Sequence, residues 1–258
     1  MKLGFISDLH LEFHRDYQDW VDLANMVNNS NVDLVINAGD IHPKPEARQN
    51  FHSLIKVPYQ YILGNHDFYG QQFLERSRFD FKSGQNTIAA CTLWTDFNKN
   101  DPLTMYRFVE TLADGHQILP KHEKVLADEI YQHHLSDKMY LETERPNIVV
   151  THHAPSYKSV HPRFRSTGYI NSYFASDLDE FIMDHQPEIK LWVFGHTHNR
   201  CHYKIGDTLC VNNALGYPGE NYKNIDDYKI MIIDMNNLPK SFDNTTWLDN
   251  SSWPVIEI

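Results

Sequence analysis

The sequence predicts an α/β fold with a functional site at the carboxyl ends of buried strands. Three observations support this prediction. Short apolar runs have the composition of buried strands, segments with helical periodicity lie between them, and each run ends at a group of polar residues that can bind metal. The runs are residues 2–7, 32–37, 57–63, 147–151 and 190–194.

The polar groups that follow the five runs are the strongest functional signal. They are Asp8-Leu9-His10, Gly39-Asp40, Gly64-Asn65-His66-Asp67, Thr151-His152-His153 and Gly195-His196-Thr197-His198, in the order of the runs. Binding sites of open sheets gather beyond the carboxyl ends of the strands, so we expect side chains far apart in the sequence to converge there. Gly39, Gly64 and Gly195 lie between strand and ligand, where the chain must turn sharply and its backbone must approach an ion.

Helices and further strands are predicted from periodicity and turn signals. Trp20, Leu23, Ala24 and Val27 recur at helical spacing and predict a helix with one apolar stripe. A capping box at residues 176–179 predicts a second helix that begins there and ends before Pro187. Runs at 201–204, 208–211 and 228–234 are typical of strands separated by turns.

The chemistry of the ligands indicates the metal. Carboxylate, imidazole and amide groups without cysteine suit Mn, Fe, Zn, Ni or Co better than a thiolate-rich structural zinc site or an all-oxygen calcium site. A single ion cannot use so many ligands and keep an open position. We therefore expect two divalent ions that share a carboxylate and lie roughly 3.5–4 Å apart.

The five motifs resemble those of the calcineurin-like metallophosphoesterases, whose pattern is D-x-H, G-D, G-N-H-D/E, a later H, and G-H-x-H. The resemblance covers residues 8–198. It implies a four-layer α/β/β/α sandwich, the metallo-dependent phosphatase fold, in which two mixed β-sheets are flanked by helices. It also implies that one ion is held by Asp8, His10, Asp40 and His198, and the other by Asp40, Asn65, His152 and His196, with Asp40 bridging.

The same resemblance implies hydrolysis of a small phosphomonoester or phosphodiester. One zinc ion already lowers the pKa of water from about 15.7 to ~7, so a hydroxide bridging two ions is the expected nucleophile. His66 is the expected general acid for the leaving alkoxide. The alternatives are a nuclease or nucleotide pyrophosphatase of the same family, or a binding scaffold with an idle metal site. The complete ligand set and the presence of His66 favour the enzyme over the scaffold.

Candidate substrate contacts lie beside the metal motifs. Arg163 and Arg165 follow the fourth motif, and guanidinium groups bind phosphate oxygens through paired hydrogen bonds, although solvated loop residues explain them equally well. His153, next to the ligand His152, is a third candidate. Further along, Ala214 and Leu215 replace the Pro and Arg of an Asn-Pro-Arg-Gly-Tyr segment that many bacterial relatives carry, so we assign Leu215 no role.

Composition sets the outer limits. The 258 residues, 41% of them hydrophobic, suffice for one domain over residues 1–258, with a mainly helical insertion around 96–145 that forms either a lid or an ordinary decoration. No apolar run approaches the ~20 residues that span a bilayer, and the N-terminus lacks a signal pattern, so we expect no membrane association.

Three cysteines at irregular spacing suit a reducing, cytoplasmic compartment. The net charge of −11 argues against extended nucleic acid as a partner, and the oligomeric state stays open.

Overall fold

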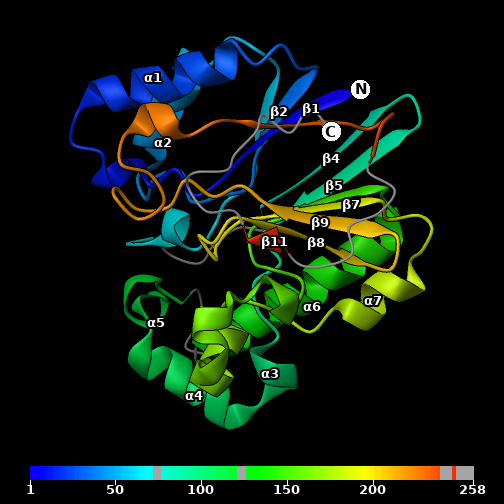
Figure 1. Cartoon of the computed structure of the whole chain (residues 1–258). Coiled ribbons are helices and arrows are strands. Elements are labelled where there is room, and N and C mark those ends of the chain that lie inside the picture. The colour runs from blue at the N-terminus through cyan, green and yellow to red at the C-terminus, as the bar shows by residue number, and fades with distance from the viewer. Residues whose placement is uncertain (72–76, 121–125, 239–245, 248–258) are drawn as a thin grey trace.

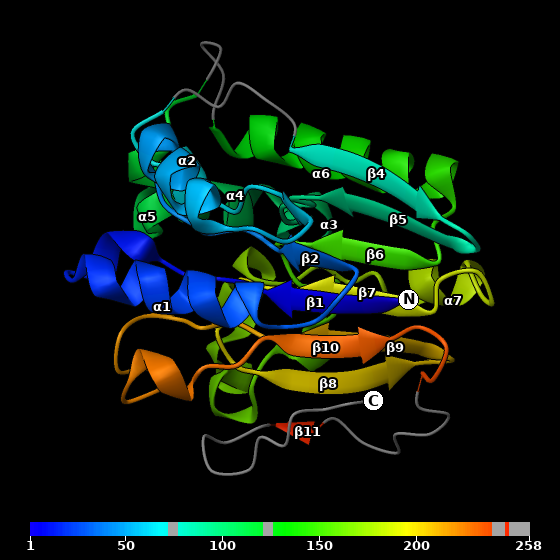
Figure 2. The same ribbon diagram turned by 90° about the horizontal axis from the view of Figure 1, so that it is seen from above.

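The computed structural model describes residues 1–71, 77–120, 126–238 and 246–247, and its architecture is a four-layer sandwich. Two mixed β-sheets pack face to face, with helices on both outer faces (Figure 1). Seen from above, strands of the smaller sheet lie over those of the larger one (Figure 2). The predicted α/β/β/α fold is therefore confirmed.

The smaller sheet carries the first three metal motifs. Its strand order is β10-β1-β2-β3, with bounds Met231–Asp234, Lys2–Ile6, Leu34–Asn37 and Tyr59–Tyr61. Strands β1, β2 and β3 are parallel, whereas β10 is antiparallel to β1. The loops that follow β1, β2 and β3 consequently emerge at one edge of the sheet.

The larger sheet carries the remaining two motifs. Its order is β11-β8-β9-β7-β6-β5-β4, with bounds Thr246–Trp247, Cys201–Ile205, Thr208–Asn212, Leu191–Phe194, Ile148–Thr151, Asn86–Cys91 and Arg78–Ser83. Strands β5, β6, β7 and β9 are parallel, so the motifs after β6 and β7 also share one edge. The β4–β5 hairpin, which turns at Gly84 with φ +61°, was not predicted.

Helices cover both outer faces of the sandwich. Helices α1 (Tyr17–Asn28) and α2 (Pro45–Leu54) lie on the smaller sheet, and α6 (Leu126–Glu144) and α7 (Asp179–Asp184) lie on the larger one (Figure 1). Helix α1 buries Leu23, Ala24 and Val27, as the periodicity predicts.

The predicted capping box of the second helix is wrong. Helix α7 begins at Asp179, and its N-cap residue Leu178 offers no side-chain hydrogen bond. The hydroxyl of Ser176 instead accepts a hydrogen bond from the backbone N–H of Asp96, at 3.1 Å. A long-range contact therefore uses the side chain that local sequence assigned to the helix.

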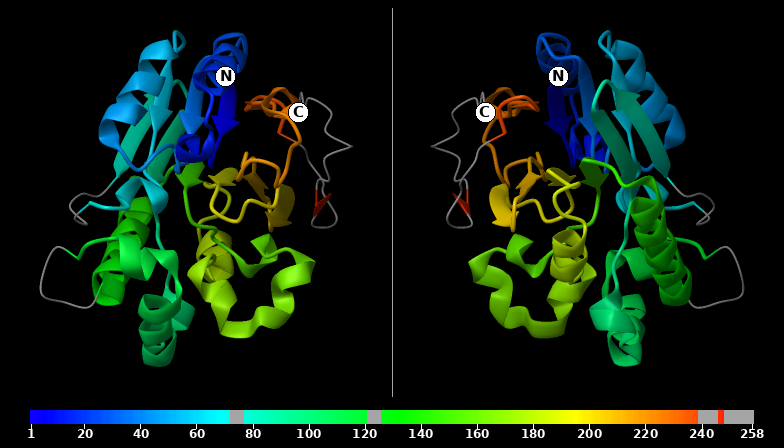
Figure 3. Two further views of the ribbon diagram at one scale, coloured as in Figure 1. Left: turned by 90° about the vertical axis from the view of Figure 1, so that its left-hand side faces the viewer. Right: turned by 90° about the vertical axis from the view of Figure 1, so that its right-hand side faces the viewer.

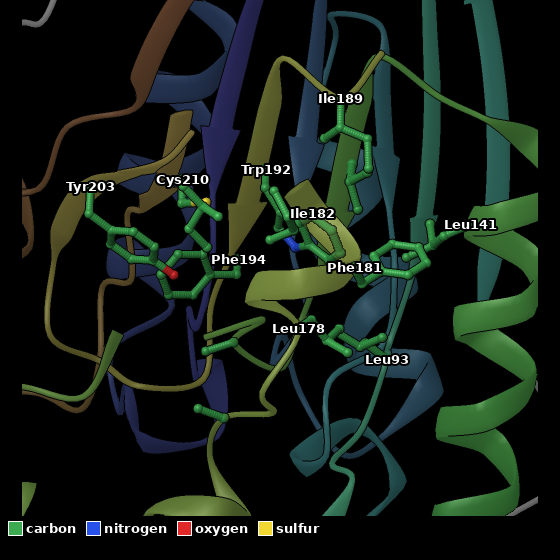
Figure 4. Packing of buried hydrophobic residues seen from close by; sticks show 14 of the residues in the cluster. Leu93, Leu141, Leu178, Phe181, Ile182, Ile189, Trp192, Phe194, Tyr203 and Cys210 are labelled. Carbon is green, nitrogen blue, oxygen red and sulfur yellow. The ribbon is translucent and has the colours of Figure 1, made fainter. Parts of the chain in front are cut away.

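Apolar layers hold the sheets and helices together. Alternate residues of the strands, such as Phe5 and Val150, meet between the two sheets. On the other face of the larger sheet, Trp192 packs with Phe181 and Ile182 of α7 (Figure 4). Full burial of one large apolar side chain contributes about 1.5–3 kcal/mol, so these layers fix the strands whose ends carry the metal motifs.

A helical region lies at one end of the molecule, beside the edge that carries the motifs. It contains α3 (Phe97–Asn100), α4 (Pro102–Thr111), α5 (Ala113–Gln117) and the 3-10 segment η4 (Pro162–Tyr173), which Figure 3 shows at the same end. The Tyr173 hydroxyl of η4 donates to the carbonyl of Thr104 in α4, at 3.1 Å. Shorter 3-10 turns are η1 (Leu11–Phe13), η2 (His66–Phe68), η3 (Tyr157–Ser159) and η5 (Ile225–Asp227). Among the described residues, no helix combines the length and apolar character needed to cross a membrane.

Candidate metal centre

The seven predicted ligands converge at the shared edge of the two sheets. Two sets of three have ligand atoms within 4.8 Å of one another: Asp8, His10 and His198, and Asp40, His152 and His196. We call them the first and the second set. The Oδ2 atom of Asp40 lies 3.7 Å from Nε2 of His10 and 3.4 Å from Nε2 of His152, so this carboxylate stands between the sets.

Asn65 joins the second set. Its amide oxygen Oδ1 lies 2.9 Å from Nε2 of His152. The ring of His152 is oriented from its other side, because Nδ1 lies 2.9 Å from the backbone carbonyl oxygen of Ala38 and donates to it. In the neutral ring, Nε2 then carries a lone pair that faces an amide oxygen, so two acceptors meet without a proton between them.

The first set shows the same pattern. Nδ1 of His198 lies 2.8 Å from the Glu220 carboxylate, and Nδ1 of His10 lies 3.3 Å from that of Glu12. Both carboxylates accept from these nitrogens, so the two Nε2 atoms, 2.9 Å apart, face each other with lone pairs.

Facing acceptors of this kind are stable only when a cation or an extra proton lies between them. Histidines that bind metal commonly donate their other N–H to a carboxylate or a backbone carbonyl. His10, His152 and His198 all do so. The donor set therefore fits two divalent cations.

The charges of the surrounding side chains favour positive charge beside Asp40, His152 and His198. Burial opposes ionisation of Asp40, yet His152 and His66 hold the pKa of this carboxyl well below its usual value. Burial likewise opposes charging of the histidines, but Asp40 raises the pKa of His152 to about 9, and Asp8 with Glu220 raises that of His198 to about 10. Carboxylates thus create a negative field that stabilises cations here.

The backbone at the ligands is unusual. Asp8, His10, Asp40, His196 and His198 all have positive φ, between 44° and 66°. Residues other than glycine rarely adopt this conformation, at a cost of order 1 kcal/mol each, and such strain is concentrated at functional sites.

Glycines make room for the ligand side chains. A Cβ on Gly39 would lie 2.7 Å from Nδ1 of His152, and one on Gly64 would lie 2.5 Å from Cε1 of the same ring. A Cβ on Gly195 would lie 2.5 Å from Oδ2 of Asp8. All of these distances are too short for real contacts. The motifs therefore contain glycine at these positions because a ligand side chain packs directly against the backbone there.

Asp67 ties two of the metal-binding loops together. Its carboxylate accepts hydrogen bonds from the backbone N–H groups of Asp40, Ile41, His42 and Gly64, at 2.9–3.0 Å. The structure shows that it joins the loop after β2 to the loop after β3.

Sequence reasoning missed a group of residues around His66. Nδ1 of His66 lies 3.2 Å from the Glu12 carboxylate, and its Nε2 lies 3.1 Å from the Tyr217 hydroxyl. Burial raises the pKa of Glu12, but hydrogen bonds from His10 and His66 outweigh it and lower the pKa to about 2. A carboxylate two residues after His10 was the only sequence signal for Glu12.

The helical insertion also reaches the site. Asp114 of α5 accepts hydrogen bonds from the Asn65 amide at 2.8 Å and from the Tyr69 hydroxyl at 2.6 Å. This contact holds the Asn65 side chain with its amide oxygen toward His152. Nothing in the local sequence of α5 marks Asp114.

A cavity of about 720 Å³ opens beside the metal ligands. Its wall includes Asp40, Asn65, His66, His196 and His198, and it continues over residues of η1, α5 and η4. The insertion therefore forms part of the wall next to the site.

The three predicted substrate contacts do not line this cavity. Arg163 donates to the Asn199 amide oxygen at 3.0 Å and lies over the ring of Phe164. Arg165 lines a separate hollow together with Lys158, and His153 is buried against the rings of Trp94 and His196. Their role in substrate binding stays a prediction.

Comparisons with known proteins agree with the fold. The family described as calcineurin-like phosphoesterase matches residues 1–200. An uncharacterized protein, L509, from Acanthamoeba polyphaga mimivirus is 25% identical over 281 residues, which cover 90% of this chain and 96% of the viral protein.

Solved structures are similar in fold at low sequence identity. Phosphopantetheinyl hydrolase from Mycobacterium tuberculosis aligns with a TM-score of 0.68 at 14% identity, over 92% of this chain and 98% of that one. GAP50, the anchor in the inner membrane complex of Plasmodium, aligns with a TM-score of 0.50 at 15% identity, over 99% and 86%. At such identities these structures show the fold alone. The match over residues 1–200 is what assigns this chain to the calcineurin-like phosphoesterase family.

Proposed function

We propose that this protein is a binuclear metal-dependent phosphoesterase that hydrolyses a small phosphomonoester or phosphodiester. The observation that carries the proposal is the facing of acceptor atoms in both sets, with the Asp40 carboxylate between them. One ion would be held by Asp8, His10, Asp40 and His198, and the other by Asp40, Asn65, His152 and His196.

The ligand chemistry suits Mn, Fe, Zn, Ni or Co. Two such ions, when bound, would lower the pKa of a water molecule and draw charge from the phosphoryl oxygens. The protein would supply the geometry, because Glu12, Glu220 and the Ala38 carbonyl fix the imidazole rings from behind.

His66 would protonate the leaving alkoxide from Nε2. It lines the cavity, and its Nδ1 is held by Glu12, so Nε2 is directed toward the open side, where it meets the Tyr217 hydroxyl. Burial opposes its protonation, but the charges of Asp40 and Glu12 raise the pKa of His66 above its usual value. A general acid must carry its proton on the nitrogen that faces the leaving group, and the contact of Nδ1 with Glu12 leaves Nε2 for that proton.

The test begins with protein from which metals have been removed by chelation. Mn, Ni, Co, Zn and Mg are added back separately, and hydrolysis of bis-p-nitrophenyl phosphate and p-nitrophenyl phosphate is measured with the bound metal content. We expect two ions per chain and turnover that returns only with a transition metal. Failure of every metal to bind, or binding without turnover on any ester, would contradict the proposal.

Variants locate the activity in this site. Asp40→Asn should lose metal and activity while the circular dichroism spectrum is retained. Asp80→Asn, on the exposed side of β4, is the matched control and should keep both. Undiminished hydrolysis by Asp40→Asn would exclude the bridging role.

A further inference from the structure

We propose that the cavity beside the metal centre binds an uncharged, largely apolar substituent, so that the substrate is a phosphodiester with a single phosphate. This inference rests on the proposed function and narrows its substrate class.

The first argument is the shape and lining of the cavity. Its volume of about 720 Å³ lies within the range of small-molecule sites, roughly 300–1,000 Å³. Metal ligands form one end. Away from them the wall is mainly apolar, with Phe13 from η1, Leu112 before α5, Val160 after η3, and Phe164, Ile170 and Phe174 in and next to η4.

The second argument is the exposure of these apolar side chains. Phe13 is 48% exposed, Phe164 41% and Ile170 38%, and all of them line the same cavity. A single exposed apolar residue is common on protein surfaces. Several around one cavity next to a reactive centre form a surface that an apolar part of a ligand can cover, with a gain in free energy from the area removed from water.

The third argument is charge. Among the described residues that line the cavity there is no lysine and no arginine, whereas Glu12, Asp40, Asp114 and Glu220 bring carboxylates. The guanidinium of Arg163 contacts two residues of the wall, Asn199 and Phe164, and Arg163 itself is not among the lining residues.

Charge matching then separates substrate classes. Two divalent ions carry four positive charges, and the carboxylates of Asp8, Asp40, Glu12 and Glu220 already match them. Asp114 adds a fifth carboxylate to the wall. A phosphodiester brings one negative charge, whereas a phosphomonoester or a second phosphate brings more, and no lysine or arginine is among the described residues of the wall to receive it. The site therefore favours the diester.

The hydrolytic test keeps the leaving group constant. Methyl, hexyl and phenyl p-nitrophenyl phosphate are compared, together with p-nitrophenyl phosphate and an ester whose hexyl chain ends in a second phosphate. We expect kcat/KM to be roughly tenfold or more higher for hexyl and phenyl than for methyl, because each methylene buried in the cavity favours binding. The monoester and the ester with two phosphates should be the poorest substrates.

A variant tests whether the cavity is responsible. Ile170→Asp places a carboxylate in the apolar wall, and it should abolish the preference for hexyl over methyl. Leu103→Asp is the matched control, since Leu103 is an exposed residue of α4, 54% exposed, that is not among the residues lining the cavity. It should keep the preference.

Binding gives a readout that does not depend on turnover. Calorimetric titration with hexyl(methyl)phosphinate, a monoanion with two P–C bonds and no ester bond to hydrolyse, should show affinity roughly tenfold or more above that of dimethylphosphinate. The gain should disappear in Ile170→Asp.

The outcomes separate this inference from the function on which it rests. Hydrolysis of the esters at equal kcat/KM for methyl and hexyl, or a preference for p-nitrophenyl phosphate, would overturn the inference and leave the phosphoesterase in place. Equal affinity for the two phosphinates would overturn it as well. Absence of hydrolysis with all esters and metals would instead contradict the proposed function, while the phosphinate titrations still decide whether the cavity takes an apolar group.

Discussion

Replacement of Glu220 tests how the protein holds its metal ligands. The Glu220 carboxylate accepts from Nδ1 of His198 at 2.8 Å and from the backbone N–H of Tyr217 at 3.1 Å. It thereby fixes both the tautomer and the direction of the His198 ring. We expect Glu220→Ala to weaken binding of the ion held by the first set, and to leave the ion of the second set nearly unchanged.

The size of the effect follows from the exposure of Glu220. Loss of a hydrogen-bond partner behind a metal ligand typically costs 10–100-fold in metal affinity. The Glu220 side chain is 34% exposed, so water can replace part of its interaction. We therefore expect roughly a tenfold loss for Glu220→Ala, about 1.4 kcal/mol, and a smaller loss for Glu220→Gln, which keeps an acceptor oxygen but not the charge.

The assay is a competition titration of the chelated protein with Zn or Mn against a fluorescent chelator. Two binding steps should be resolved, and only one should weaken in the variants. Glu188→Gln, an exposed residue before β7 and at the far end of that strand from Gly195, is the matched control. Affinities within twofold of the unmodified protein for both ions, or equal weakening of both, would refute the reasoning.

Three other perturbations give separate outcomes. Gly64→Ala should abolish metal binding, measured as metal content, because a methyl group would overlap the ring of His152. Gly70→Ala is its control, since no atom lies within 4 Å of the added methyl group. It should keep the metals and lose about 1–2 kcal/mol of stability in urea unfolding, because residue 70 has a positive φ. His66→Ala should keep both ions and lose roughly 100-fold or more in kcat on an alkyl ester, with a smaller loss on p-nitrophenyl esters, so equal losses would exclude the general acid. Burial lowers the pKa of His52 to about 4, below the ~6.5 of an unfolded chain, so folding is favoured above pH 6.5 and loses this contribution as the pH falls toward 4. His52→Gln should flatten the dependence of unfolding free energy on pH over that interval, and an unchanged slope would contradict the assignment.

The sequence predicted the strands that form continuous apolar runs and missed the hairpin of β4 and β5. Strands β1, β2, β6 and β7 lie between other layers, so their residues form continuous apolar runs. Strand β4 is an edge strand with exposed, charged positions, and its apolar residues occur only at every second position. Alternation of apolar and polar residues over so short a segment is a weak signal for a strand, so the hairpin of β4 and β5 was not predicted.

The residues of the candidate site can likewise be divided into those that the sequence predicted and those that it missed. The convergence of the candidate metal ligands could be predicted because each of them follows a strand whose end is fixed by the fold. Glu220 and Asp114 reach the ligands only through tertiary contacts, from a loop and from the insertion, and no local pattern marks them. Arg163 and Arg165 do not line the cavity beside the ligands, because a sequence places a residue in a loop but does not tell in which direction its side chain points.

The strained backbone at the ligands indicates how the centre is preorganised. Five candidate ligands adopt positive φ, which would cost several kcal/mol in total if the chain were free to relax. The chain is held instead by hydrogen bonds between the motif loops, such as those from the backbone N–H of Asp8 to the carbonyl of Gly39 and from that of His10 to the carbonyl of Asp40, and by the Asp67 carboxylate. These contacts join protein groups to one another and involve no metal. The backbone of the ligand loops is therefore held by the two packed sheets and by contacts between the loops, whereas the facing acceptor atoms of the side chains still require a cation or a proton between them.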